Sequence, residues 1–173
     1  GDSTVGKAPH GEGNIITLNG GDGVSITGTG TDNNTVSGNL IGLDADGTRD
    51  IRIQAMAISP NYANDNTLFI GTRVHGVWKT TDGGNSWTEV NSGLTILDVR
   101  SLAVSPNYAT DKSLFAGTVS GGIFKTTDGG GSWTKVDGGI TSNNINSLAF
   151  SPVYSSDGQV FAGTNGSGVF AST

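Results

Sequence analysis

A repeat of 46 residues constrains the fold of this chain more than any other feature. The string LAVSPNYATDKSLFAGT at residues 102–118 has close copies at residues 56–72 and 148–164. Three prolines mark the same interval: Pro60, Pro106 and Pro152. Because the interval never slips, each copy is predicted to be one structural module that is repeated in space.

Each copy predicts four short antiparallel strands, since turn residues separate alternating apolar runs at intervals of about 8–12 residues. In the second copy the expected strands are 99–104, 114–118, 122–127 and 132–136. In the second of these strands, Leu114 and Ala116 face one side, and Phe115 and Gly117 face the other. A four-stranded repeat of about 40–50 residues has the size of a propeller blade.

Composition excludes the main alternatives to an all-β fold. The chain holds 29 glycines and four prolines in 173 residues. Every stretch of about a dozen residues either contains glycine or proline or lacks a helical period, which excludes a helical bundle. Glycine does not recur at every third position, which excludes collagen. We therefore expect an all-β fold with no helix in the repeats.

Charge and cysteine content exclude further classes. There is no cysteine, and thus no disulfide, thiolate metal site or cysteine nucleophile, which suits a secreted chain. The net charge is −6, and residues 1–50 hold two basic against seven acidic residues. An acidic chain without a basic stripe is a poor nucleic-acid binder. No apolar run predicts a membrane span or a signal peptide, so an exported protein would be represented in its mature form.

The most specific motif joins the third and fourth expected strands of a repeat. It reads TTDGGNSW at 80–87 and TTDGGGSW at 126–133. The aspartate can accept hydrogen bonds from backbone amides of its own turn, and the glycine pair can supply positive φ angles. The tryptophan is expected to bury its ring over the hairpin. The residues concerned are Thr80, Asp82, Gly84, Trp87, Thr126, Asp128, Gly130 and Trp133.

These turns resemble the Asp-box, or bacterial neuraminidase repeat. Proteins with this motif include sialidases, sortilin-type receptors, xyloglucanases, photosystem II assembly factors and secreted bacterial proteins, and the resemblance covers residues 51–173. It implies a propeller in which the Asp-box is a peripheral folding element without a role in chemistry. Three further aspartates, before the second strand of each repeat, are predicted to cap turns: Asp65, Asp111 and Asp157.

The repeat array is incomplete, because the third copy ends in GVFAST where the others continue into TTDGG. The predicted blades are 51–96, 97–142 and 143–173, with four, four and three strands. A closed propeller needs at least about four blades. We therefore expect an open face at each end of the array that something must cover.

Residues 1–50 form a different, β-rich segment without the repeat. Within it, residues 13–48 resemble right-handed parallel β-helix surface proteins, and residues 33–48 are similar to one rung of such a helix. The clustered carboxylates of Asp44, Asp46 and Asp50 could bind calcium, because carboxylates are hard oxygen ligands. The alternative is a solvated acidic turn without a metal. Thr48 stands where an EF-type loop needs its third acid, so a solvated acidic turn is preferred. No cofactor is expected.

Catalytic residues do not assemble in the sequence, so the chain is not expected to be an enzyme. The only histidines are His10 and His75, the only glutamates are Glu12 and Glu89, and all three tyrosines occupy one equivalent repeat position. One candidate contact for a sugar or a partner departs from the repeat pattern: Arg73, His75 and Trp78. The alternative is surface drift, with Trp78 taking the core position of Phe124 and Phe170.

The preferred function is that of a non-catalytic structural or interaction protein, secreted or on the cell surface. It would assemble with itself into a ring or filament by completing the open array, with the missing strand supplied by a second copy or by residues 13–42. The alternative is a fragment of a larger propeller with carbohydrate-binding or glycoside hydrolase activity. A third option is a membrane-complex assembly factor, which only fold analogy supports.

Overall fold

The structure is a computed structural model that describes residues 17–18, 24–26, 36–37, 51–136 and 138–172. The chain divides into two compact units, residues 1–51 and 52–173. The described residues form antiparallel sheets and three helices of a single turn, which confirms the predicted all-β class. None of the described helices is long and apolar enough to cross a membrane.

The first unit contains three short strands, β1 (Thr17–Leu18), β2 (Val24–Ile26) and β3 (Val36–Ser37). They pair antiparallel in this order, as in a meander, whereas the predicted β-helix rung would pair in parallel with neighbouring rungs. Of residues 33–48, which carry that resemblance, the structure describes only β3. The calcium candidates Asp44, Asp46 and Asp50 lie outside the described residues.

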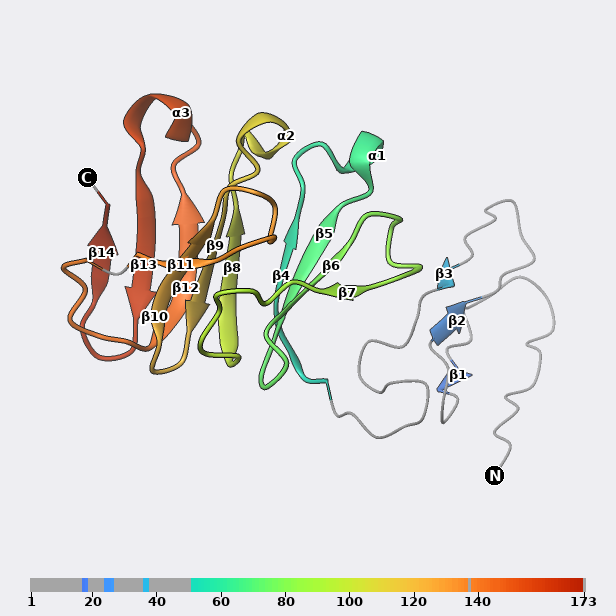
Figure 1. The fold of residues 1–173 in the computed structure, drawn as a ribbon, viewed down its shortest axis with the longest axis horizontal. Helices are drawn as coiled ribbons and strands as arrows, with labels where there is room; N and C mark the ends of the chain where they lie inside the picture. The colour runs from blue at the N-terminus through green and yellow to red at the C-terminus, as the bar shows by residue number, and fades with distance from the viewer. Residues whose placement is uncertain (1–16, 19–23, 27–35, 38–50, 137, 173) are drawn as a thin grey trace, which may run out of the picture. The chain divides into compact units, whose positions relative to one another are not determined.

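The second unit holds one sheet for each repeat, which we call blades 1, 2 and 3 (Figure 1). Blade 1 consists of β4 (Ile53–Ile58), β5 (Leu68–Thr72), β6 (Val77–Thr80) and β7 (Thr88–Glu89). Blade 2 consists of β8 (Val99–Val104), β9 (Leu114–Thr118), β10 (Gly122–Thr126) and β11 (Thr134–Lys135). Blade 3 consists of β12 (Ile145–Phe150), β13 (Val160–Thr164) and β14 (Val169–Ala171). The predicted strand numbers of four, four and three are confirmed, and the fourth strands are shorter than expected.

Each repeat also contains one helical turn where only a capped turn was predicted: α1 (Tyr62–Asp65), α2 (Tyr108–Asp111) and α3 (Tyr154–Asp157). The expectation of no helix in the repeats is wrong at these three four-residue segments. The aspartate acts as predicted, because Asp65 accepts hydrogen bonds from Ser59 Oγ at 2.7 Å and from the Thr67 amide at 2.9 Å. A left-handed residue ends each helix after one turn.

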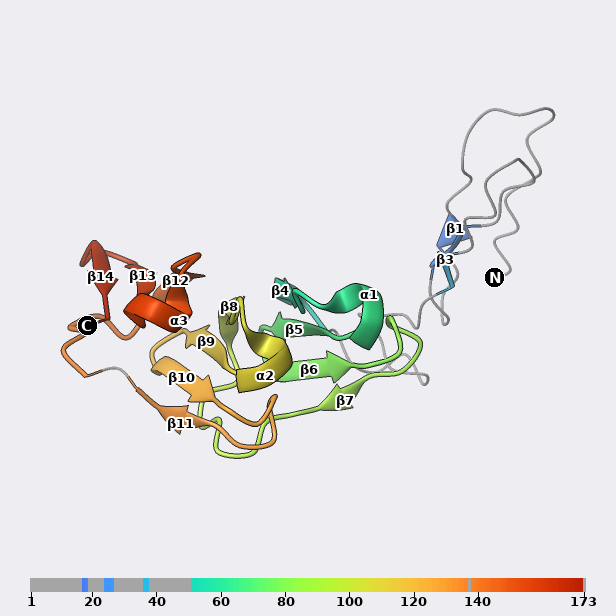
Figure 2. The same cartoon turned by 90° about the horizontal axis from the view of Figure 1, so that it is seen from above.

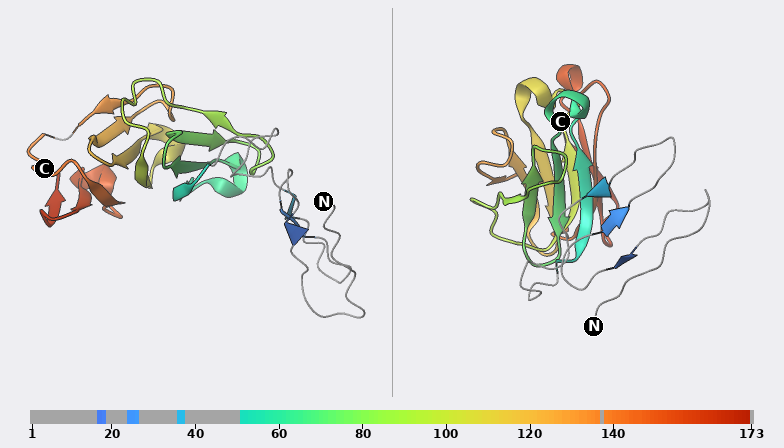
Figure 3. Two further views of the ribbon diagram at one scale, coloured as in Figure 1. Left: turned by 90° about the horizontal axis from the view of Figure 1, so that it is seen from below. Right: turned by 90° about the vertical axis from the view of Figure 1, so that its right-hand side faces the viewer.

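Adjacent blades lie face to face, with β4, β8 and β12 along one side and β7 and β11 along the other (Figure 2). The side chains of each strand alternate between two faces. We call the face toward the following blade the forward face, and the opposite one the rear face. The three helical turns lie at one end of the blades, as a side view also shows (Figure 3).

Two apolar cores fill the spaces between the blades. In the first, Phe69 and Val77 on the forward face of blade 1 pack with Leu114, Ala116 and Phe124 on the rear face of blade 2. The second core repeats this arrangement one blade further along; its buried members are Phe115, Ile123, Ile145, Val160 and Ala162. The blades therefore share cores rather than each having its own.

A glycine in the second strand lets the next blade approach closely. A Cβ atom at Gly71 would lie 2.6 Å from Val99 Cγ1, and one at Gly117 would lie 2.5 Å from Ile145 Cγ2. Real Cβ atoms do not come this close to neighbouring carbons. The glycine of the repeated LF-x-GT string thus makes room for the first strand of the following blade.

Candidate functional site

The TTDGG turn of blade 1 satisfies its own polar groups. Thr80 Oγ1 donates a hydrogen bond to Asp82 Oδ1 at 2.7 Å and accepts one from the Gly84 amide at 2.9 Å. Asp82 also accepts from the Ser86 hydroxyl at 2.6 Å and from the Ser86 amide at 2.9 Å. These bonds, that of the Ser86 hydroxyl first, hold the pKa of Asp82 well below its ordinary value.

The turn of blade 2 repeats this geometry. Asp128 accepts from the Thr126 hydroxyl at 2.6 Å and from the Ser132 amide and hydroxyl at 2.9 and 2.8 Å. The hydrogen bond from Thr126, followed by those from Ser132, lowers the pKa of Asp128 to about 2. Gly129 and Gly130 have φ angles of 73° and 99°, so the glycine pair supplies the positive φ that the sequence analysis expected. Each carboxylate is therefore engaged in holding its turn.

The two tryptophans of these turns occupy different environments. Trp87 is half-buried, and its Nε1 donates to the Gly84 carbonyl of its own turn at 3.2 Å. Trp133 is buried, and its Nε1 donates to the Val90 carbonyl of blade 1 at 2.7 Å. Its amide donates to the Ser92 carbonyl at 2.8 Å. Trp133 therefore joins two blades, whereas the sequence analysis expected it to cover only its own hairpin.

The segment of blade 1 that receives Trp133 is formed by Val90, Gly93 and Leu94, which we call the first socket. Gly93 has a φ angle of 82°, and a Cβ atom there would overlap the carbonyl oxygen of Trp133. Leu94 is buried in the core between blades 1 and 2. This socket was not predicted, although a valine and a glycine recur 46 residues later at Val136 and Gly139.

The predicted ligand contact, Arg73, His75 and Trp78, is divided between two places. Arg73 and His75 lie in the turn between β5 and β6, where their amides donate to the Arg52 carbonyl at 2.9 Å and to Thr72 Oγ1 at 3.0 Å. Trp78 lies on β6, opposite Ile70 on the rear face. This is the position that Phe124 occupies in the core of the next blade, which favours a packing role for Trp78.

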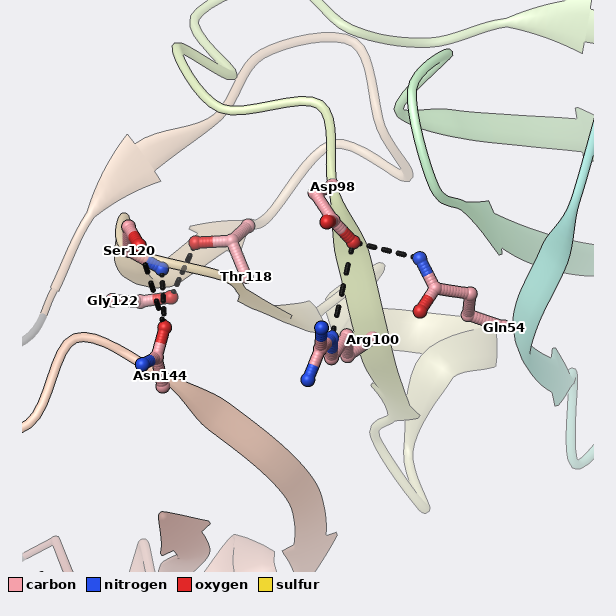
Figure 4. A network of polar contacts seen from close by, with 7 residues as sticks. All are labelled: Gln54, Asp98, Arg100, Thr118, Ser120, Gly122 and Asn144. Atoms are coloured by element: carbon pink, nitrogen blue, oxygen red, sulfur yellow. Dashed lines mark hydrogen bonds and ion pairs between the residues drawn. The ribbon is translucent and has the colours of Figure 1, made fainter. Parts of the chain in front are cut away.

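Figure 4 shows polar contacts that link neighbouring blades. These contacts were not predicted. Gln54 Nε2 donates to Asp98 Oδ1 at 2.7 Å, and Arg100 Nε lies 4.0 Å from the same oxygen. One repeat further along, the Ser120 amide donates to Asn144 Oδ1 at 2.8 Å. Asp98 and Asn144 are equivalent residues that precede β8 and β12, so each helps to fix the register of its blade against the one before.

The described part of the chain brings together no group of three or more histidine, cysteine, aspartate or glutamate side chains that could hold a metal. The carboxylates of Asp82 and Asp128 accept hydrogen bonds within their own turns. The described residues instead form contact surfaces between blades, which consist of the apolar faces and the first socket.

No protein-family model matches the sequence, and no curated protein matches it. Among solved structures it is similar to an ancestral GH74 enzyme, with 26% identity and a TM-score of 0.55 over 66% of this chain and 14% of that one. The GH74 enzyme of Niastella koreensis gives 27% identity and a TM-score of 0.53 over 70% and 21%. PorZ, a surface component of the type-IX secretion system of Porphyromonas gingivalis, gives 18% identity and a TM-score of 0.53 over 69% and 17%.

These similarities define the class of the fold. The chain is an all-β repeat protein of the β-propeller type. It spans only 14–21% of the length of the proteins above and thus corresponds to a sector of such a fold. The identification of the turns as Asp-boxes stays a prediction.

We predict that Gly93→Ala destabilises the chain more than Gly139→Ala. Both glycines have nearly the same φ, 82° and 83°, so both substitutions should cost about 1–2 kcal/mol of backbone strain. Only Gly93 lies against Trp133, whereas a Cβ atom at Gly139 has open space around it. Overpacking should add about 1–3 kcal/mol at Gly93 alone. Urea unfolding of the two variants measures the difference; equal losses would contradict the packing role of the first socket.

The carboxylates of the two TTDGG turns predict how stability depends on pH. The pKa of Asp128 is about 2 in the folded chain, below about 3.9 for an unfolded aspartate. Its stabilisation is therefore present above about pH 4 and is lost as the pH falls through about 2. We expect Asp128→Asn to lower stability at pH 7 and to reduce the rise in stability between pH 2 and pH 4, and the double variant with Asp82→Asn to reduce it further. Urea unfolding across this range tests this, and an unchanged pH dependence in the double variant would refute it.

Proposed function

We propose that this chain is a non-catalytic structural and interaction module of a secreted or cell-surface protein, and that blades of a second copy complete its array. The absence of cysteine supports an exported location, because such a chain does not depend on the redox state of its surroundings. The use of Asp82 and Asp128 within their own turns supports a role without catalysis. We propose that no cofactor takes part.

The observation that carries the proposal is the exposure of stacking residues at blade 3. The equivalent phenylalanines Phe69, Phe115 and Phe161 are 0%, 9% and 38% exposed. The equivalent residues Val77, Ile123 and Val169 are 0%, 5% and 74% exposed. In blades 1 and 2 the following blade covers both positions. Blade 3 therefore presents the same apolar forward face, with no described blade in front of it.

The rear face of blade 1 offers the complementary surface. Met56 and Ile58 are 58% and 54% exposed, whereas their equivalents Leu102 and Val104 in blade 2 pack partly buried against the first core. The exposed part of the rear face of blade 1 thus supports the proposal that it meets the forward face of blade 3, although Ile70 on the same rear face is only 1% exposed. Two different faces that fit each other give a head-to-tail assembly, a ring or a filament.

Strand addition is a second route to completion. Within the described residues, β14 has β13 on one edge and no fourth strand on the other. A strand from a second copy, or one from residues 13–42, would satisfy the backbone groups of that edge. The structure describes only β1, β2 and β3 of residues 13–42.

We predict that the chain self-associates with rising concentration and that Val169→Glu weakens the association about tenfold or more, because a carboxylate would be buried between two apolar faces. Val153→Glu is the matched control, since Val153 is 57% exposed but precedes α3 outside the blade faces. Sedimentation velocity measures both variants. A monomer at all concentrations, or equal effects of the two substitutions, would remove the second copy from the proposal.

The alternative function is that of one sector of a larger propeller with carbohydrate-binding or glycoside hydrolase activity. The 26% and 27% identity to two GH74 enzymes favours it. In that case the native protein has a mass well above 17.5 kDa, and its own further blades cover the end faces.

For this alternative, we predict that the chain binds one class of glycan on a glycan array and that Arg73→Ala removes the binding, because Arg73 is exposed in the turn between β5 and β6. Arg100→Ala serves as control, since its side chain lies near Asp98 instead. The absence of any glycan binding would count against the alternative.

A further inference from the structure

We infer that the open edge of β14 and a second, unfilled socket on blade 2 together bind the turn and outer strand of one further repeat, whose tryptophan enters the socket. This second socket consists of Val136, Gly139 and Ile140, the equivalents of Val90, Gly93 and Leu94. The inference rests on the proposed function in one respect only: both take blade 3 as open to completion.

The first socket shows what the second is built to hold. Trp133 reaches it with two hydrogen bonds, from Nε1 to the Val90 carbonyl and from its amide to the Ser92 carbonyl. Val90 also lies against the TTDGG turn, since a Cβ atom at Gly130 would come within 3.1 Å of it. The tryptophan is left 4% exposed. A complete socket therefore contacts both the tryptophan and the second glycine of the TTDGG turn of the next blade.

The second socket has the same valine and glycine, with isoleucine in place of leucine, and its glycine position is open among the described residues. Gly139 has the same backbone conformation as Gly93, with φ angles of 83° and 82°. Among the described residues, a Cβ atom at Gly139 would meet nothing within 4 Å, whereas one at Gly93 would overlap Trp133. Val136 is 40% exposed. The position is thus preformed without the group that fills its counterpart.

The edge of β14 would hold the other half of the segment. In blades 1 and 2, the residue after the fourth strand donates to the third strand, from the Val90 amide to the Val77 carbonyl and from the Val136 amide to the Ile123 carbonyl, both at 2.9 Å. The equivalent carbonyl in blade 3 belongs to Val169, at the start of β14. Strand pairing at this edge and insertion of a tryptophan into the second socket are therefore two contacts of one segment.

The occupant is defined by this chemistry as a segment of the type T-T-D-G-G-x-S-W-T-x-V. The aspartate and hydroxyl groups close the turn, as they do around Asp82 and Asp128. The tryptophan supplies both apolar area and a hydrogen-bond donor. Pairing continues an interface that the chain already forms between blades 1 and 2.

The test uses the whole chain and a fluorescein-labelled peptide with the sequence of residues 126–136. Fluorescence anisotropy is expected to show saturable binding, and hydrogen exchange is expected to show new protection of the β14 amides. The peptide with Trp133→Ala should bind about tenfold more weakly or worse, because the socket is left unfilled. Gly139→Ala in the chain should weaken binding of the original peptide to a similar extent, because its Cβ blocks the tryptophan backbone.

Gly166→Ala is the matched control, since Gly166 also has a positive φ and open space but lies in the turn between β13 and β14. It should leave binding unchanged. The absence of saturable binding, or binding that is indifferent to both Trp133→Ala and Gly139→Ala, would overturn the inference.

The outcome is distinguishable from that of the proposed function. Peptide binding by a chain that stays monomeric keeps the inference and removes self-assembly. Self-association without peptide binding keeps the proposed self-assembly and overturns the inference.

Discussion

The structure depends on one constraint: a blade has two apolar faces and cannot cover either by itself. Phe69 and Val77 are fully buried only because the rear face of blade 2 lies against them, and Phe115 depends on blade 3 in the same way. In arrays of this kind, stability is the sum of weak single modules and strong contacts between neighbours. The glycines Gly71 and Gly117 belong to the same constraint, since they let the first strand of the next blade come into contact.

The peripheral turns show how neighbours decide what a motif does. Both TTDGG turns close through the same hydrogen bonds, with Asp82 and Asp128 as acceptors, so the turn needs no help from outside. The tryptophan after the turn of blade 2, by contrast, depends on the adjacent blade for its hydrogen-bond acceptor. Trp133 finds the Val90 carbonyl of the preceding blade, whereas the Nε1 of Trp87 turns back to Gly84. One motif therefore provides both a folding element and a connector, and only the second role depends on the adjacent blade.

Sequence patterns predicted what is local and periodic. The 46-residue interval placed the strands, and the alternation of Leu114, Phe115 and Ala116 assigned the faces that the two cores confirm. The one-turn helices were missed because four residues are too few for a helical period. The Trp133–Val90 bond and the Gln54–Asp98 contact were not predicted because their partners lie 43 and 44 residues apart. The two-residue alternation of a strand predicts which face a side chain lies on, but not which residue of a neighbouring blade it contacts. The predicted ligand or partner contact at Arg73 and His75 has no such periodic signal to test it.

If the proposed assembly takes place, completion of the array has an order that follows from the sockets. A blade stacked on blade 3 would cover Phe161 and Val169, yet its tryptophan would need a socket like that of Val90 and Gly93. Such a socket follows the outer strand of a blade, and the described part of blade 3 ends its sheet at β14. Addition of the outer strand therefore creates the place for the next tryptophan, and stacking before that step would leave the tryptophan without its hydrogen-bond acceptor. Growth of the array by strand and then by blade makes each contact depend on the previous one, as expected where neighbour contacts dominate stability.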